Sequence, residues 1–239
     1  MAAAQKMNQL YEGKAKRVFA TADPGLCIVD YKDDATAFNG LKKGQIAGKG
    51  VINNRVTNHL MRLMERNGIP THFVEELSER ETLVKKVDIV PLEVIVRNIA
   101  AGSLSTRLGL PEGEKLRSTV LEFSYKNDEL GDPMVNDYHI AAMNLATKEE
   151  VAIICDYAMR VNEILGGYLK TAGVELIDFK LEFGKTPDGT IILADEISPD
   201  TCRFWDSKTG EKLDKDRFRR DLGGVEDAYR EILRRLLGE

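Results

Sequence analysis

The sequence predicts an α+β protein. Its strand-like segments come in groups, at residues 10–31, 72–97 and 176–197, and helical patterns lie between and after these groups. Strict alternation of strands with helices, which is typical of a doubly wound parallel sheet, is not found. With 239 residues, 43% of them hydrophobic, the chain can bury a large core in one domain or in two tightly joined parts.

The first group of strands is expected to form a small antiparallel sheet. Residues 14–19 and 26–31 have strand-like composition, and the turn sequence Ala22-Asp23-Pro24-Gly25 separates them. An amphipathic helix is expected over residues 50–67, because apolar residues recur at helical spacing until Asn67-Gly68 ends the pattern.

Three strand-like runs follow, at residues 72–75, 83–89 and 92–97. Only Val90-Pro91 separates the last two. A hinge at this point would divide the chain into a β-rich part, residues 1–90, and a larger part, residues 91–239.

The second half is expected to hold an ordered loop, a long helix, a hairpin and terminal helices. Residues 127–136 are rich in turn formers. Thr147 opens a Thr-Lys-Glu-Glu sequence that fits a capping box, and the helix pattern continues to Gly173. The hairpin strands and the last two helices are predicted at residues 176–183, 191–197, 215–222 and 225–236.

Composition excludes several classes of function. The 34 Lys and Arg against 39 Asp and Glu give a formal charge of -5, so no general attraction to nucleic acid or to an anionic membrane is expected. The three cysteines lack the spacing of a zinc site or a disulfide framework, and the three histidines lack that of a Ser-His-Asp arrangement. No run of about eighteen apolar residues could span a bilayer. We expect a soluble cytoplasmic protein.

The most informative segment is the first strand of the predicted hairpin. Successive side chains of a strand point to opposite faces. Asp178, Lys180 and Glu182 should therefore share one face, while the apolar residues between them face a core.

A two-residue turn at Asp188-Gly189 would place Glu182 directly opposite Asp195, and a four-residue loop would keep both on one face. Two carboxylates that face each other repel unless a cation neutralises them, and Mg²⁺ is the usual cation where carboxylates meet nucleotide phosphates. The same pattern also fits a half-exposed strand with ordinary ion pairs, so both interpretations stay open.

Three more segments could bind anionic groups. Residues 11–17 combine a glycine with three cations where a strand turns, although a solvated face would look similar. The signatures of a Walker loop, a dinucleotide loop and a kinase catalytic loop are not found. Residues 97–103 offer an arginine and a small-residue turn suited to a phosphate monoester. Residues 195–206 carry Arg203 beside the only tryptophan, Trp205, where an ordinary surface ion pair and a core residue are the alternative.

Together these segments resemble the phosphoribosylaminoimidazole-succinocarboxamide synthase (SAICAR synthetase) family. Residues 89–97, continuing to Ala101-Gly102-Ser103, and residues 176–184 carry most of the resemblance. Further similar stretches lie at residues 11–16, 127–136 and 195–206, so that the resemblance covers nearly the whole chain.

The resemblance implies an ATP-dependent ligase of purine biosynthesis. Such an enzyme joins L-aspartate to the carboxylate of carboxyaminoimidazole ribotide (CAIR), through an acyl phosphate, and releases SAICAR, ADP and phosphate. It also implies an N-terminal antiparallel β-rich lobe, a larger mixed α/β lobe and an ATP cleft between them, distantly like protein kinases and ATP-grasp enzymes. The apolar stripes at both ends of the chain would suit a homodimer as well as a core.

Carried over position by position, the resemblance gives each ligand a set of residues. Those for ATP are Gly13, Lys14, Ala15, Lys16, Lys85 and Glu93, and those for Mg²⁺ are Glu182 and Asp195. Those for the ribotide are Arg97, Ser103, Asp132, Asp178, Lys180, Asp200 and Arg203, among which Asp178 and Lys180 are the catalytic candidates. The loop over residues 34–49 is the candidate site for aspartate.

Two other functions fit the same residues. A small-molecule kinase would leave a stable phosphorylated product and form no amide. A nucleotide-binding module without catalysis would tolerate the loss of Glu182 and Lys180.

Overall fold

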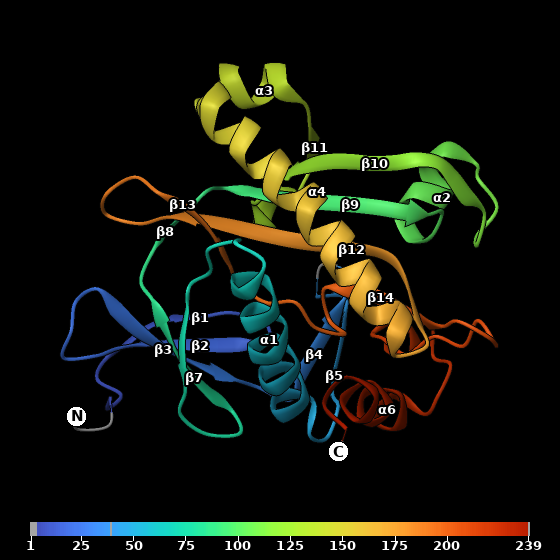
Figure 1. Cartoon of the computed structure of the whole chain (residues 1–239), viewed down its shortest axis with the longest axis horizontal. Coiled ribbons are helices and arrows are strands. Elements are labelled where there is room, and N and C mark those ends of the chain that lie inside the picture. Colours follow the sequence, from blue (N-terminus) through green and yellow to red (C-terminus); the bar gives the residue numbers. More distant parts are fainter. Residues whose placement is uncertain (1–3, 39, 239) are drawn as a thin grey trace.

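The computed structural model describes residues 4–38 and 40–238. It contains a five-stranded sheet and a seven-stranded sheet, in both of which all neighbouring strands are antiparallel (Figure 1). The predicted α+β class with antiparallel sheets is therefore confirmed. The division of the chain at residues 90 and 91 stays a prediction. The main core contains buried residues from both sides of that point.

The first sheet has the order β1-β2-β3-β7-β6. Its strands are Gln9–Glu12, Lys16–Ala20, Leu26–Tyr31, Glu81–Lys85 and Phe73–Glu76. The turn predicted at residues 22–25 joins β2 to β3, where the Asp23 carboxylate accepts a hydrogen bond from the Gly25 N–H at 2.8 Å. A separate hairpin pairs β4 (Asp34–Ala37) with β5 (Lys42–Gln45), and the sequence reading did not anticipate it.

The second sheet has the order β11-β10-β9-β12-β13, and β12 also pairs with β8 and β14. Its strands are Met134–Val135, Lys115–Tyr125, Leu92–Ile99, Val174–Lys185, Ile191–Ala194, Asp88–Ile89 and Cys202–Asp206. The central strand β12 therefore has neighbours on both sides, which buries most of its length.

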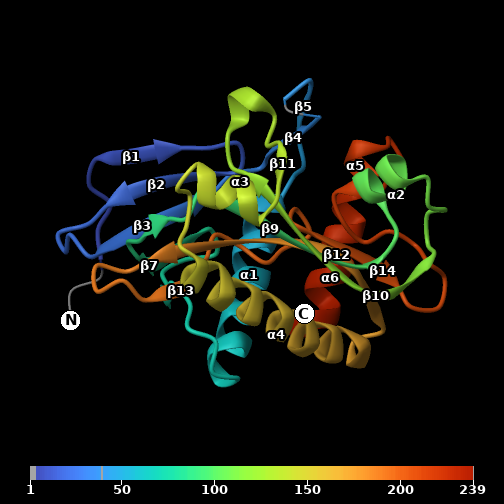
Figure 2. The ribbon, with the colours of Figure 1, turned by 90° about the horizontal axis from the view of Figure 1, so that it is seen from above.

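The helices cover the sheets and close the core. They are α1 (Lys49–Arg66), α2 (Gly102–Leu108), α3 (Asp137–Ala142), α4 (Lys148–Thr171), α5 (Asp216–Arg219) and α6 (Val225–Leu237), with a 3₁₀ turn at Asp128–Leu130. Helix α4 packs on β12 and β9, while α1 packs on β3 and on α6 (Figures 1 and 2). These contacts leave the opposite face of β12 free for polar side chains.

The predicted helix start at Thr147 is confirmed. The Thr147 hydroxyl accepts a hydrogen bond from the Glu150 N–H, and the Glu150 carboxylate accepts one from the Thr147 N–H. The helix predicted over residues 215–222 is shorter than expected and covers only Asp216–Arg219. Asp221 has a left-handed φ of 54° and Gly223 and Gly224 follow it, so the chain leaves the helical conformation there.

The predicted register of the β12–β13 hairpin is wrong by one residue. Glu182 pairs with Ala194 and Lys185 with Ile191, so the connecting loop has five residues, 186–190. The Asp188 carboxylate organises this loop by accepting hydrogen bonds from the hydroxyls of Thr186 and Thr190. The loop is thus longer than the turn assumed from Asp188-Gly189.

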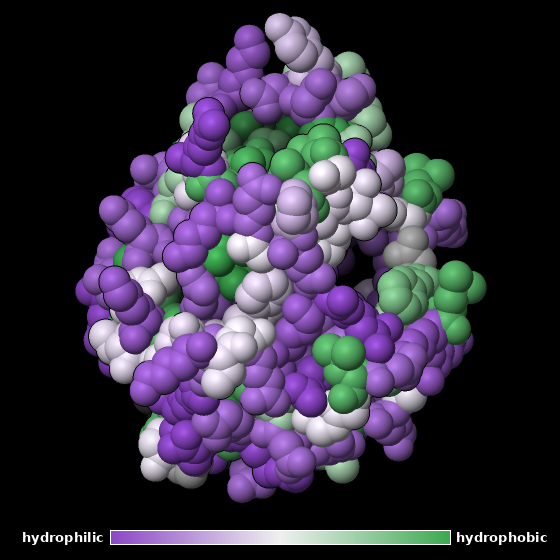
Figure 3. All heavy atoms as spheres, turned by 90° about the vertical axis from the view of Figure 1, so that its right-hand side faces the viewer, coloured by the Kyte–Doolittle hydropathy of each residue, from purple (hydrophilic) through white to green (hydrophobic). Residues whose placement is uncertain are grey.

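The surface seen in Figure 3 is mainly hydrophilic. Within residues 4–38 and 40–238, none of the helices combines the length and the apolar character that crossing a membrane requires.

Candidate active site

The structure has two neighbouring pockets, which share part of their lining. The first, of about 600 Å³, is lined by residues of both sheets. The second, of about 340 Å³, is lined by the β4–β5 hairpin, by β9 and β12, and by segments near the C-terminus. The residues common to both linings are Lys14, Glu93, Lys180, Asp200, Thr201 and Lys215. Groups bound in the two pockets can therefore meet at this boundary.

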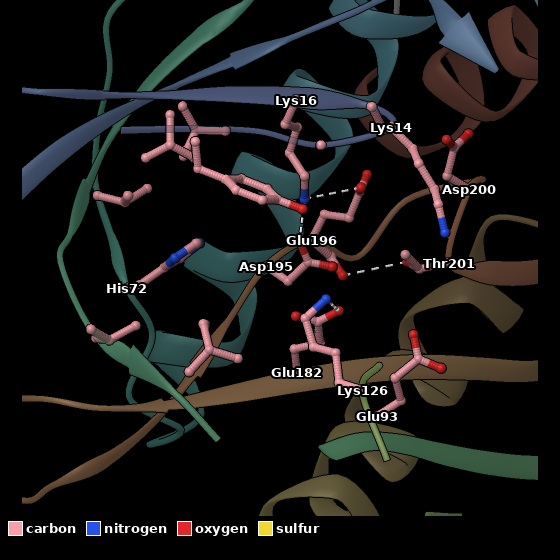
Figure 4. A pocket seen from close by; sticks show the side chains of 18 of the residues that line it. Lys14, Lys16, His72, Glu93, Lys126, Glu182, Asp195, Glu196, Asp200 and Thr201 are labelled. Atoms are coloured by element: carbon pink, nitrogen blue, oxygen red, sulfur yellow. Dashed lines mark hydrogen bonds and ion pairs between the residues drawn. The ribbon is translucent and has the colours of Figure 1, made fainter. Parts of the chain in front are cut away.

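The first pocket has an apolar end and a charged end. Strands β1, β2, β3 and β7 and the segment after β7 supply the apolar lining, which includes Leu10, Val18, Val29, Val84 and Val87. At the other end, lysines and carboxylates from both sheets converge (Figure 4). We call these the ammonium cluster, which consists of Lys16, Lys126, Lys180, Glu93, Glu182, Asp195 and Glu196.

Lys180 lies at the centre of the ammonium cluster. Its Nζ is 2.8 Å from Glu182 Oε1, 3.0 Å from Glu93 Oε1 and 4.0 Å from Asp195 Oδ2. The alternation predicted for this strand placed Asp178, Lys180 and Glu182 on one face, and the three residues do line the pockets. Burial alone would lower the pKa of Lys180, but the charges of Glu182, Asp195 and Glu93 raise it overall, so the side chain is an ammonium.

Asp195 reaches the cluster by a route that strand pairing does not provide. With the observed register, continued pleating would turn its side chain away from Glu182. Asp195 instead lies beyond the end of β13 with a left-handed φ of 56°, which redirects the side chain. The carboxylate then pairs with Lys16, whose Nζ is also 3.1 Å from Glu196 Oε1. Glu182 and Asp195 thus both line the first pocket and approach Lys180, but not through the strand pairing that the sequence predicted.

The lysines hold Asp195 in its ionised form. Burial would raise the pKa of this carboxyl group, yet the charges of Lys16 and Lys180 lower it overall. His72 lines the same pocket, and burial, helped by the charge of Lys16, lowers its pKa to about 4. The imidazole is therefore neutral at physiological pH and adds no charge to the cluster.

Glu182 and Asp195 fit a divalent cation by their chemistry. Among the described residues, no three His, Cys, Asp or Glu side chains gather as a complete metal site. Mg²⁺, however, commonly takes only one or two carboxylates and fills its remaining positions with water and substrate phosphates. Both carboxylates already lie near a cation, because each approaches the ammonium group of Lys180.

The second pocket is built around two arginines. Arg97 donates from Nε to Glu122 at 2.8 Å and from its other nitrogens to Asp178 at 3.2 Å and Ser103 at 3.0 Å. Arg203 donates to Asp178 and to Asp216, each at 2.8 Å. We call these the guanidinium cluster, which consists of Arg97, Arg203, Glu122, Asp178 and Asp216.

Gly102 allows the guanidinium cluster to form beside α2. Its φ is +52°, and a Cβ at this position would collide with the guanidinium of Arg203. Glycine at this position therefore leaves the Arg203 guanidinium in its place beside Ser103, whereas any other residue would displace it and adopt a strained backbone. Burial would lower the pKa of Arg203, but Asp178 and Asp216 raise it. Arg203 is thus part of a buried network and is not the ordinary surface ion pair that the sequence also allowed.

The remaining predicted nucleotide residues lie in the first pocket. Gly13, Lys14, Ala15 and Lys16 all line it. Lys14 pairs with Asp128 across the pocket mouth at 2.7 Å, and both side chains are exposed. Lys85 lines the pocket as well, while its Nζ donates to the carbonyl of Thr71 at 3.0 Å.

Asp132 and Asp200, two of the residues predicted for the ribotide, have defined partners. Asp132 lines the first pocket, but its carboxylate accepts the Asn127 N–H at 2.9 Å and so shapes its own loop. Asp200 borders both pockets and accepts hydrogen bonds from Lys49, Lys215 and the hydroxyl of Tyr229. Residues 36–38 and 40, within the loop predicted for aspartate, line the second pocket.

Sequence reasoning missed Lys126, Glu196, His72 and Lys215, and it included Lys49 only as the end of the loop predicted for aspartate. Glu196 carried a signal, since it directly follows Asp195 in an acidic segment. Lys126 belongs to no motif that we recognise. Lys49 and Lys215 form ion pairs with Asp200 that only the folded structure reveals. Lys126, Lys49 and Lys215 share no local sequence pattern that could have identified them as site residues.

Comparison with known proteins gives the family of the chain. Residues 9–236 match the SAICAR synthetase family. A phosphoribosylaminoimidazole-succinocarboxamide synthase from Coprothermobacter proteolyticus is 64% identical over 232 residues, which are 97% of this chain and 98% of that protein. The crystal structure of the synthase from Ehrlichia chaffeensis has a TM-score of 0.95 at 46% identity, with coverage of 96% and 98%. A SAICAR synthetase in complex with ADP has a TM-score of 0.93 at 51% identity, with coverage of 96% and 97%.

Fold, charged pockets and near-complete matches together define an enzyme of the ligase class. The chain belongs to the SAICAR synthetase family.

Proposed function

We propose that this chain uses ATP to join L-aspartate to the carboxylate of CAIR, giving SAICAR, ADP and phosphate. The observation that carries the proposal is the position of Lys180, at the boundary of the two pockets and beside two carboxylates that can hold a metal ion. The ADP complex of a relative with 51% identity supports nucleotide binding, and the apolar and charged ends of the first pocket make that pocket the candidate site.

The nucleotide would occupy the first pocket with its base at the apolar end. Val18, Val29 and Val84 offer the flat apolar contact that a purine needs, and Lys85 lies beside them. The phosphates would then extend toward Lys14 and Lys16, while Gly13 lets the backbone approach closely. Glu182 and Asp195 would hold Mg²⁺, which neutralises phosphate charge when bound.

The ribotide would occupy the second pocket. Arg97, Arg203 and the Ser103 hydroxyl would bind its 5′-phosphate, since arginine forks match phosphate oxygens. Asp178 would accept hydrogen bonds from the ribose hydroxyls. The imidazole carboxylate would then lie at the pocket boundary beside Lys180, where it can meet the end of the nucleotide.

Aspartate would enter between the β4–β5 hairpin and the C-terminal segments. Lys215 and Arg219 line this side of the second pocket and offer positive charge to its two carboxylates. The loop over residues 34–49 is retained here as the proposed site, with these two cations added from the structure.

The chemistry follows from these positions. A carboxylate oxygen of the ribotide attacks the γ-phosphorus of ATP, and the bond to ADP breaks. Lys180 orients the carboxylate, and Lys14 and Lys16 stabilise the negative charge on the phosphates. The amine of aspartate then attacks the carbonyl carbon of the acyl phosphate. Phosphate leaves with the former carboxylate oxygen, and the amine loses a proton.

Omission of each substrate in turn tests this function. ADP release should require CAIR, and formation of the amide should require aspartate as well, with mass spectrometry identifying SAICAR. Brisk ATP hydrolysis indifferent to CAIR and aspartate would contradict the proposal. A stable phosphorylated product without an amide would indicate a kinase instead.

A further inference from the structure

Glu182 shares one oxygen with two ammonium groups. Its Oε1 lies 2.8 Å from Lys180 Nζ and 3.2 Å from Lys126 Nζ. The carboxylate is only 6% exposed, so these lysines supply most of the positive charge that stabilises it. Figure 4 shows Lys126 and Glu182 side by side at the charged end of the first pocket.

Lys126 differs from Lys180 in how firmly it is held. Lys180 has two further carboxylates within reach, Glu93 at 3.0 Å and Asp195 at 4.0 Å. Lys126 pairs only with Glu182 among the described residues, and its side chain is 42% exposed toward the pocket. Its backbone is fixed, because its N–H donates to the carbonyl of Pro91 at 3.1 Å. The side chain can therefore change partner without moving the loop.

A divalent cation and these ammonium groups compete for the same oxygen. A metal ion that binds Glu182 Oε1 is repelled by the two positively charged groups that contact the same oxygen. Withdrawal of the ammonium groups relieves this repulsion. Lys180 then retains Glu93, whereas Lys126 is left to find another anion, and the nearest space it lines is the proposed phosphate end of the first pocket.

We infer that Lys126 and Lys180 are tethered counter-ions of Glu182 that the metal displaces, and that the released Lys126 contacts the nucleotide phosphates. This inference rests on the proposed nucleotide and metal sites. It gives Lys126 two consecutive roles, in which it first suppresses binding of a metal ion without nucleotide and then strengthens binding of the nucleotide.

A single variant tests both roles, because loss of the Lys126 charge should strengthen the binding of the metal and weaken the binding of the nucleotide. Lys126→Met keeps the length of the side chain and removes its charge. Binding of Mn²⁺ without nucleotide, followed by electron paramagnetic resonance of the free ion, should tighten by about fivefold. Binding of ADP in the presence of saturating Mn²⁺, when Lys126 has left Glu182, is followed by calorimetry and should weaken by about fivefold. A merely structural lesion would weaken both.

Matched variants complete the experiment. Lys180→Met should also tighten Mn²⁺ binding, and Glu182→Gln combined with Lys126→Met should remove the gain. Lys185→Met is the control. Lys185 lies on β12, the strand of Lys180 and Glu182, and pairs with Glu150 at 2.5 Å outside the ammonium cluster. It should change neither affinity.

The outcomes separate the inference from the proposed function. If the unaltered protein binds Mn²⁺ together with ADP, but Lys126→Met shifts the affinity for Mn²⁺ and the affinity for ADP with Mn²⁺ in one direction or shifts neither, the inference is wrong and the proposed sites stand. If the unaltered protein binds no ADP with or without Mn²⁺, the proposed nucleotide site is wrong and the inference is overturned with it.

Discussion

The two charged clusters use different cations and hold them in different ways. In the ammonium cluster, Lys180 divides its contacts among three carboxylates at distances from 2.8 to 4.0 Å. In the guanidinium cluster, Arg97 makes three directed hydrogen bonds from separate nitrogens while its side chain is 4% exposed. An ammonium is a point charge that can exchange partners, whereas a guanidinium is a rigid fork.

This difference matches the two tasks that the pockets are proposed to perform. A phosphate monoester that only needs to be held suits a preformed arginine site. Phosphoryl transfer moves charge from one oxygen to another, so cations that can follow the charge are better suited to it. Substitutions in the two clusters should therefore differ in which kinetic constant they change.

The largest effect is expected for Glu182→Gln, which removes one charge at the centre of the ammonium cluster. Turnover should fall by about 10³-fold, because the proposed metal loses a ligand and Lys180 loses a partner. Steady-state assays of ADP release measure this. Glu175→Gln, on the same strand and paired with Lys115 at 3.2 Å, is the control and should retain activity. A loss smaller than about tenfold for Glu182→Gln would contradict a metal-binding role.

The next effect concerns stability and tests whether His72 is held neutral beside the ammonium cluster. His72 faces Lys16, Lys85 and Asp195, and burial together with Lys16 lowers its pKa to about 4 from 6.5. Between these values the unfolded chain binds more protons than the folded protein. Stability from this group is therefore complete above pH 6.5 and is lost as the pH falls toward 4, by about 3 kcal/mol at most.

Urea denaturation of the protein and of His72→Asn at several pH values measures that contribution. The variant should lose less stability than the unaltered protein between pH 6.5 and 4. Parallel pH profiles for the two proteins would show that the imidazole is not held neutral beside Lys16.

A smaller effect is expected in the guanidinium cluster. Arg203→Lys keeps the charge and removes the fork, so the KM for the ribotide should rise by about 30-fold while the KM for ATP changes little. Arg220→Lys is the control, because Arg220 is more exposed and pairs with Glu112 outside the pocket. An equal rise in both KM values for Arg203→Lys would remove the distinction between the clusters.

The smallest effect is expected at the mouth of the first pocket. Lys14 is 47% exposed and its partner Asp128 is 65% exposed, so their ion pair contributes little to stability. Lys14→Ala should raise the KM for ATP by about fivefold without changing the melting temperature. Asp128→Asn should lower that KM, since Lys14 is then free for phosphate. A rise for Asp128→Asn would show that the ion pair assists binding.

The parts predicted best from sequence are those that local patterns determine. Alternation on β12 placed Asp178, Lys180 and Glu182 on one face, and the capping box located the start of α4. The hairpin register failed because loop length depends on how Asp188 bonds its neighbours. Lys126 could not be found, because its contact with Glu182 joins residues 56 positions apart and arises only when β10 and β12 both pair with β9.

The central claim is that the ribotide carboxylate is phosphorylated beside Lys180 before aspartate attacks it. The most direct measurement uses CAIR with ¹⁸O in both carboxylate oxygens, ATP and aspartate, and analyses the released phosphate by mass spectrometry. One ¹⁸O atom should appear in each phosphate, because the acyl phosphate transfers a carboxylate oxygen to phosphorus. Phosphate without ¹⁸O, formed together with SAICAR, would contradict the account.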